Sequence, residues 1–121
     1  MNYTINNDGT TNGSGDVAIK ILPDFTQYII YSDGRVYNRA TDNWLNEKTN
    51  RREHYATISM KNDKNNRVTM SLHKLIYTTF IGEVPQGMQI NHKDENRRNN
   101  LILFDKNGNI TYTNLEVVTA K

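Results

Sequence analysis

The first half of the chain alternates between apolar and polar positions, which predicts a series of short β-strands. The alternating stretches are residues 17–22, 55–60 and 67–72. Strands show this period of two because successive side chains point to opposite faces of a sheet. Residues 26–38 add two Tyr-rich pieces around Asp33-Gly34, a common hairpin pair. We therefore expect residues 26–72 to form one small antiparallel sheet of short strands.

The apolar period changes to that of a helix at residues 71–81. One apolar face is formed by Leu72, Leu75, Ile76, Thr79 and Phe80. These positions follow the i, i+3, i+4, i+7 spacing that places side chains on one side of a helix. Ser71 is a suitable N-cap residue and Gly82 a suitable stop, so the sequence predicts a helix between them.

The last third again has the composition of strands and turns. We expect strands at residues 88–92, 101–104, 110–113 and 114–119. Asn107-Gly108 predicts a hairpin turn between the second and third of these, and the polar residues 93–100 predict a loop or a single helical turn. One helix with several antiparallel strands gives a predicted fold class of α+β.

Composition excludes several classes of protein. The 121 residues contain no cysteine, which excludes a disulfide scaffold, a cysteine-ligated zinc site and a thiol nucleophile. There is no apolar run of about 18 residues and no signal-peptide pattern at the start, so we expect a cytoplasmic protein with no membrane partner. A glycine-rich phosphate loop, a dinucleotide motif and a Ser/His/Asp triad are also missing, so no small-molecule substrate is predicted.

Three segments differ in composition. Residues 1–16 are rich in Asn, Thr, Gly and Ser and are expected to form a flexible leader. Residues 17–70 hold nine of the 15 Lys and Arg residues, so they are expected to be a small β-rich module that contacts DNA. Residues 71–121 form the region that begins with the predicted helix.

Positive charge is concentrated in the middle of the chain. Residues 35–74 carry nine Lys or Arg against four acids, whereas residues 1–34 carry one against four and residues 75–121 carry five against five. The middle segment is therefore a candidate phosphate-binding surface for double-stranded DNA. The basic residues expected to contact DNA are Arg35, Arg39, Lys48, Arg51, Arg52, Lys61, Lys64 and Arg67, together with Arg97 and Arg98 of the later polar loop.

The segment INHKDENRRNN at residues 90–100 carries the most chemistry. Histidine has an ordinary pKa of about 6.5, so His92 is a candidate general base, and Asn91 or Asp94 is a candidate oxygen ligand for a hard cation. The alternative is a histidine that is structural or merely exposed. Because His92 follows an apolar strand, we expect its side chain to project beside the loop and His92→Ala to cost no more than about 0.5 kcal/mol.

Several short motifs occur in a recognisable order. They are His73-Lys74-Leu75-Ile76, Phe80-Ile81, Ile90-Asn91-His92-Lys93-Asp94, Asn96, Asn99-Asn100 and Asn114-Leu115-Glu116-Val117-Val118-Thr119. This series closely resembles the HNH endonucleases of the phage and intron homing type. Residues 28–38, YIIYSDGRVYN, resemble the sheet module that often precedes that nuclease domain, so the resemblance covers about residues 17–121.

The resemblance implies a ββα-metal unit, in which two strands and a helix surround one divalent ion. It implies that His92 activates the attacking water, that Asn91 gives an oxygen to Mg²⁺ or Mn²⁺, and that Asn114 holds the imidazole in its productive orientation. The ion would stabilise charge on the leaving 3′ oxygen, and the product would be a nick with a 5′ phosphate and a 3′ hydroxyl. His73 also matches the pattern and is expected to be structural or to contact phosphate.

The sequence departs from the family pattern in three places. Asn91 stands where a carboxylate would be the stronger metal ligand, and residues 101–113 resemble an added hairpin. The family's third ligand, carried by a helix after the last strand, has no counterpart before Lys121. We therefore expect a ββα-metal unit that lacks most of its final helix.

These departures leave more than one function open. The first is a DNA-nicking endonuclease, and the second is a catalytically degenerate HNH-like phage protein that binds DNA or inhibits a host protein without cutting. A small β-rich interaction domain is the third. Asn, Lys, Ile and Tyr are abundant, as is typical of A/T-rich genes, so we expect a phage or mobile element as the source and the cytoplasm of its bacterial host as the location.

Overall fold

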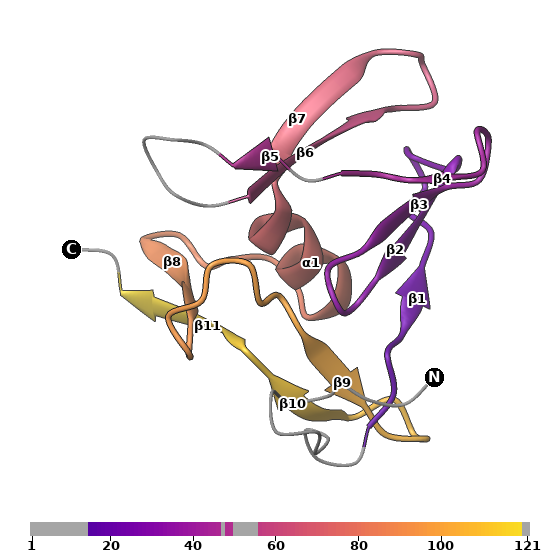
Figure 1. The fold of residues 1–121 in the computed structure, drawn as a ribbon. Helices are drawn as coiled ribbons and strands as arrows, with labels where there is room; N and C mark the ends of the chain where they lie inside the picture. The colour runs from indigo at the N-terminus through magenta and orange to yellow at the C-terminus, as the bar shows by residue number, and fades with distance from the viewer. Residues whose placement is uncertain (1–14, 47, 50–55, 120–121) are drawn as a thin grey trace.

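The computed structural model describes residues 15–46, 48–49 and 56–119. These residues form one helix and eleven strands, and all the strand pairings are antiparallel (Figure 1). The elements are β1 (Ile19–Lys20), β2 (Tyr28–Tyr31), β3 (Val36–Asn38), β4 (Asn43–Trp44), β5 (Lys48–Thr49), β6 (Ala56–Lys61), β7 (Arg67–Ser71), α1 (Leu72–Phe80), β8 (Met88–His92), β9 (Ile102–Phe104), β10 (Ile110–Thr113) and β11 (Leu115–Thr119). The predicted α+β class is confirmed. No helix in the described residues is long and apolar enough to cross a membrane.

Strands β1 to β4 form a four-stranded sheet in chain order. Tyr28 and Ile30 of β2 are buried while Ile29 and Tyr31 are only partly covered, as the alternating sequence predicts. The β2–β3 hairpin turns at Gly34, where φ is +101°, a backbone conformation that glycine adopts without steric cost.

The single sheet predicted for residues 26–72 is wrong, because the chain forms two sheets there. Strands β5, β6 and β7 make a separate three-stranded sheet. The two sheets meet through side chains: the hydroxyl of Tyr28 accepts a hydrogen bond from the backbone N–H of Lys61 at 2.8 Å, and Asp63 accepts one from the N–H of Thr26 at 2.9 Å. The inner faces of both sheets pack into one core with α1, and one flat sheet would not surround a helix in this way.

Helix α1 lies where the sequence predicts it. Ser71 occupies the N-cap position in an extended conformation, but its side chain makes no capping hydrogen bond. At the other end, the N–H groups of Ile81 and Gly82 both donate to the carbonyl of Tyr77. Gly82 has a φ of +150°, so a glycine is favoured at this helix end.

One apolar core joins the strands before residue 70 to the helix and strands after it. Its buried members are Tyr28, Ile30, Val36, Ala56, Ile58, Met60, Leu72, Leu75, Ile76, Tyr77, Ile102 and Leu115. The hairpin of residues 101–113 is thus part of the core, since Ile102 and Leu103 of β9 are both 0% exposed. Figure 1 shows α1 between the β6–β7 hairpin and the C-terminal strands. The division of the chain at residue 70 into a DNA-contacting module and an HNH-like region stays a prediction.

Strands β8 and β11 form a two-stranded ribbon at the C-terminal side of the fold. Five consecutive register pairs join them, from Leu115↔His92 to Thr119↔Met88. Residues 93–100 leave the end of β8 as a loop without a helical turn. The ribbon and this loop together position the residues that the sequence singled out for chemistry.

Candidate active site around His92

His92 is the last residue of β8, and it is 6% exposed. Its Nε2 lies 2.8 Å from Oδ1 of Asn100, a buried hydrogen bond between side chains. His92 thus lies beside the loop, but its ring is buried and hydrogen-bonded, which the sequence did not predict. Truncation to Ala would leave the buried amide of Asn100 without this partner, so we expect a cost of about 1–3 kcal/mol instead of the predicted 0.5.

A second histidine lies against the first. His73, in the first turn of α1, has its ring centroid 5.4 Å from that of His92, with the two rings at 76°. Burial lowers the pKa of His73 to about 4, and the charges of His92 and Lys74 add to this effect. His73 is therefore neutral at pH 7.

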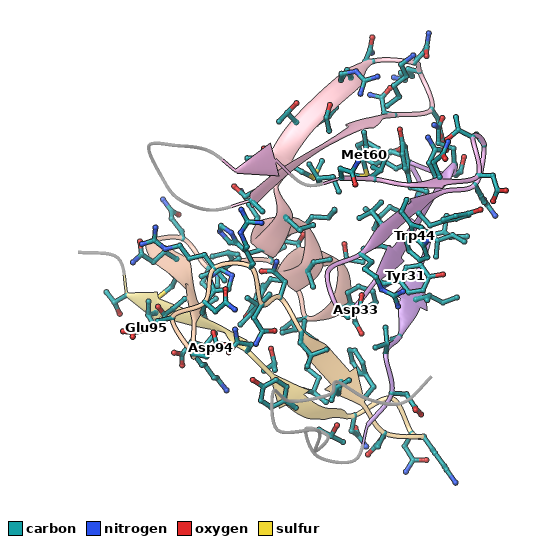
Figure 2. The ribbon with its side chains drawn as sticks, viewed as in Figure 1. Tyr31, Asp33, Trp44, Met60, Asp94 and Glu95 are labelled. Carbon is teal, nitrogen blue, oxygen red and sulfur yellow. The ribbon has the colours of Figure 1, made fainter. Side chains whose placement is uncertain are left out.

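A cleft of about 540 Å³ opens beside these two rings. It is lined by His73, Gln89, Ile90, Asn91, His92, Glu95 and Arg97. Figure 2 shows Asp94 and Glu95 on the loop next to β8. The cleft thus combines two imidazoles with two amides, a carboxylate and a guanidinium group, which can bind a polar substrate and transfer protons to or from it.

Asn91 lies on the exposed side of the β8–β11 ribbon. It pairs with Glu116 in the strand register, and its Nδ2 donates a hydrogen bond to Oε2 of Glu116 at 2.8 Å. Because neighbouring residues of a strand point to opposite faces, Asn91 and His92 leave β8 on different sides, although both line the cleft. Glu116 is the carboxylate that sequence reasoning missed, and only the register of two strands 25 residues apart reveals it.

Asn114 is 0% exposed, and its side chain is bonded to the loop of residues 93–100. Its Nδ2 donates to Oδ1 of Asp94 at 2.9 Å and to the carbonyl of Asn99 at 2.6 Å. Its Oδ1 accepts the N–H of Asp94 at 3.1 Å. Asn100 is hydrogen-bonded to the imidazole, whereas Asn114 is bonded to the loop, so a role for Asn114 in orienting His92 stays a prediction.

Asp94 is occupied by the loop itself. Its carboxylate accepts hydrogen bonds from the N–H of Asn96 and from the side chains of Asn99 and Asn114. Partial burial works to raise the pKa of Asp94, but the hydrogen bonds from Asn99, Asn96 and Asn114 outweigh it and hold the pKa below its ordinary value. Asp94 therefore stabilises the loop and is a poor candidate for a metal ligand.

Among the described residues, no group of three or more His, Cys, Asp or Glu side chains is placed to hold a metal ion. Asn91, the neighbour of His92 on β8, and Glu116, the register partner of Asn91, bring an amide and a carboxylate together. Mg²⁺ is commonly held by one or two carboxylates, water and substrate phosphate. Asn91 and Glu116 therefore fit as ligands of such an ion, and water and phosphate would supply its remaining ligands.

The predicted DNA-binding residues fall into separate groups. Lys61 and Arg67 face each other at the end of the β6–β7 hairpin, and Lys64 lies exposed in its turn. Arg97 and Arg98 are exposed on the loop after His92. The structure therefore places basic side chains both at the hairpin end and beside the cleft.

Two predicted arginines are engaged within the N-terminal sheet. Arg35 forms an ion pair with Asp33 at 2.7 Å, and its guanidinium lies 4.7 Å from the ring centre of Tyr31 and 4.9 Å from that of Trp44. Arg39 donates to the carbonyl of Thr26. Figure 2 shows Tyr31, Asp33 and Trp44 on this sheet. Arg51, Arg52 and the side chain of Lys48 lie outside the described residues.

Known proteins resemble this chain in sequence and in fold. Residues 71–121 match the HNH endonuclease family. An uncharacterized HNH endonuclease of Acanthamoeba polyphaga mimivirus, L245, is 30% identical over 100 residues, which are 83% of this chain and 27% of that protein. The HNH homing endonuclease I-HmuI, solved in a study of its DNA binding and cleavage, has a similar fold with a TM-score of 0.66 and 24% identity, over 84% of this chain and 52% of that one. The chain thus spans about a quarter of the first relative and half of the second.

Proposed function

This chain belongs to the HNH endonuclease family through its residues 71–121, and on that premise we propose that it nicks double-stranded DNA. The observation that carries the proposal is the cleft at the end of β8, whose lining includes His92, His73, Glu95 and Arg97. His92 is fixed through one ring nitrogen, which leaves the other for proton transfer. A positioned histidine of this kind is suited to general-base catalysis near neutral pH.

The proposed reaction is hydrolysis of one phosphodiester. His92 takes a proton from a water molecule, the water oxygen forms a bond to phosphorus, and the bond from phosphorus to the 3′ oxygen breaks. The leaving 3′ oxygen takes a proton from solvent water, so the products are a 5′ phosphate and a 3′ hydroxyl. Arg97, on the wall of the cleft, is suited to hold the phosphate in place.

HNH nucleases generally use a divalent metal ion. We propose Mg²⁺ or Mn²⁺ here, held by the amide oxygen of Asn91 with the carboxylate of Glu116. When bound, the ion stabilises the charge that develops on the leaving oxygen. With one carboxylate in place, the chain itself should hold the ion weakly, so we expect DNA phosphate to strengthen its binding.

The β6–β7 hairpin is the proposed DNA-contacting face. Three register pairs share its outer side, and they are Thr57↔Ser71, Ser59↔Thr69 and Lys61↔Arg67. All six are hydroxyl-bearing or basic and none is acidic. Among the described residues, the short strand β5 pairs only with Ala56 and Thr57, so the rest of the hairpin is a two-stranded ribbon, which fits the major groove of DNA. Hydroxyl and basic groups are the donors that bind phosphate oxygens, which supports the β-rich segment as the part that lies along the duplex.

DNA binding without cleavage is the second candidate function. It is favoured by the absence of a cluster of three His, Asp or Glu ligands in the part of the chain that the structure describes. A host protein as partner, the other form of that alternative, has no support in the structure or the relatives. The two remaining candidate functions therefore both require DNA binding, and only the first also requires DNA cleavage.

Nicking of supercoiled plasmid with Mg²⁺ or Mn²⁺ distinguishes them. His92→Gln is the appropriate variant, because Gln keeps an amide able to reach Asn100 but has no basic nitrogen. We expect wild-type protein to convert the plasmid to the open circle and His92→Gln to lose that activity while binding DNA equally well. Salt-dependent DNA binding with no nicking by the wild type would support the second function, and equal nicking by both proteins would refute the role of His92.

A further inference from the structure

We propose that Asn100 is a positioning residue for His92, which fixes the orientation of the imidazole and decides which ring nitrogen carries the proton. The inference rests on the proposed function for its catalytic consequence, although not for the geometry. Asn100 is 1% exposed, and its Oδ1 lies 2.8 Å from Nε2 of His92. A buried amide in a polar loop is unusual, and this hydrogen bond gives it a reason to be there.

Asn100 is itself held between two parts of the fold that are far apart in sequence. On its C-terminal side, Ile102 donates its N–H to the carbonyl of Ser32 at 2.8 Å. The side chain of Ser32 donates to the carbonyl of Ile102 at 2.7 Å. The segment that carries Asn100 is therefore bonded directly to the β2–β3 turn of the N-terminal sheet.

The β2–β3 turn also lies next to the side chain of Asn100. A Cβ atom placed on Gly34 would lie 3.4 Å from Cβ of Asn100 and 3.7 Å from its Nδ2. Gly34 thus lies so close to Asn100 that an added methyl group would touch it, while His92 bonds to the amide of Asn100. The N-terminal sheet therefore helps to fix the active-site histidine, in addition to any contact that it makes with DNA.

This arrangement selects one neutral form of the imidazole. An amide oxygen only accepts hydrogen bonds, so Nε2 of His92 must carry the hydrogen and Nδ1 keeps its lone pair. Nδ1 is then the atom that takes the proton from water. The Nε2–H···O bond persists when the ring becomes positively charged, and charge on the donor strengthens it, so Asn100 stabilises the ring throughout the reaction.

Nitrogen NMR of the His92 side chain tests the geometry without any nuclease assay. In the wild type at pH 7.5 we expect Nε2 to be protonated and Nδ1 to have the chemical shift of an unprotonated nitrogen. Asn100→Ala should shift both nitrogens toward the average of the two tautomers. Asn38→Ala is the matched control, since Asn38 is also a buried asparagine (8% exposed) and its Oδ1 accepts from Ala40 in the N-terminal sheet.

Single-turnover nicking then tests the consequence. We expect Asn100→Ala to lower the cleavage rate constant roughly 10- to 100-fold, as loss of an orienting partner does at other sites, with the DNA dissociation constant unchanged. Asn38→Ala should change neither quantity. If neutral His92 of the wild type carries its proton on Nδ1, the proposal is overturned, even where Asn100→Ala does not fold. The proposal is also overturned if Asn100→Ala folds and leaves both the His92 tautomer and the cleavage rate constant unchanged. If the tautomer depends on Asn100 but the wild type never nicks, the proposed function fails and the positioning role stands.

Discussion

Ser32→Ala should destabilise the whole protein, because Ser32 links three segments. The residue is 0% exposed. Its hydroxyl accepts the N–H of Ala18 at 2.9 Å and donates to the carbonyl of Ile102 at 2.7 Å. An alanine would remove both hydrogen bonds and leave the part-buried N–H of Ala18 and the buried carbonyl of Ile102 with one partner fewer.

The expected cost follows from those two groups. Leaving a buried polar group unsatisfied costs about 1–3 kcal/mol, and relaxation around the smaller side chain recovers part of it. We therefore expect Ser32→Ala to lower the free energy of unfolding by about 2–4 kcal/mol, a large share of the 5–15 kcal/mol typical of a domain. Ser71→Ala is the control: Ser71 holds the N-cap position without a side-chain hydrogen bond, so it should cost less than about 0.5 kcal/mol.

Urea denaturation with two probes provides the assay. Fluorescence of Trp44 in β4 follows the N-terminal sheet, and far-ultraviolet circular dichroism follows all elements. Since one core joins both halves of the described chain, the two signals should give one coincident transition that Ser32→Ala moves to lower urea. A loss below 1 kcal/mol, or a fluorescence transition that moves alone, would refute the reasoning.

Three further predictions concern charge. The pKa of His73 falls from 6.5 to about 4 on folding, so the unfolded chain binds more protons than the folded chain. The free energy of unfolding should therefore drop as pH falls from 6.5 toward 4, by on the order of 1–2 kcal/mol after allowance for solvent screening. In urea melts at pH 7.5 and 5, His73→Gln should lose this pH dependence. Joint replacement of Lys61 and Arg67 by Ala should reduce the slope of log DNA affinity against log salt by roughly two, measured by fluorescence anisotropy; an unchanged slope would exclude the hairpin end from the interface. Glu116→Gln should weaken Mn²⁺ binding roughly tenfold in calorimetry with DNA present, and equal affinity would exclude this carboxylate from the site.

Local patterns predicted most of the elements. Helix α1 and strand β8 lie at the residues that the apolar period indicates, because each has a continuous apolar face and clear polar boundaries. The two-sheet arrangement was not predicted, because strand propensity does not say which strand pairs with which. In the structure β4, which ends at Trp44, pairs with β3, whereas β5 pairs with β6.

Local sequence patterns predicted only part of the candidate site. His92 and Asn91 were found because they end an apolar strand before a polar loop. Asn100 and Glu116 were matched only as part of a motif, because their roles depend on long-range packing. Asn100 is buried and lies next to a turn more than sixty residues earlier in the chain, and Glu116 meets Asn91 only through the β8–β11 register.

Asn114→Asp offers a test of the loop that surrounds His92. The substitution keeps the shape of the side chain but replaces Nδ2, which donates to Asp94 and to the carbonyl of Asn99, with an oxygen that accepts. A buried carboxylate would then face the carboxylate of Asp94 and a carbonyl oxygen. Loss of both donors, together with repulsion between like charges, should cost about 3–5 kcal/mol at pH 7.

The pH dependence identifies the cause. In the folded variant, burial and the neighbouring Asp94 should raise the pKa of the new carboxyl above its unfolded value. The folded state then binds more protons than the unfolded state, so the gap in stability between Asn114→Asp and Asn114→Ala should narrow as pH falls from 7 to 5. Comparison of these two variants cancels the opposite trend that His73 imposes on both. A gap that stays constant over this range, or an Asn114→Asp protein as stable as the wild type at pH 7, would show that the side chain of Asn114 does not hold the loop through its amide donors.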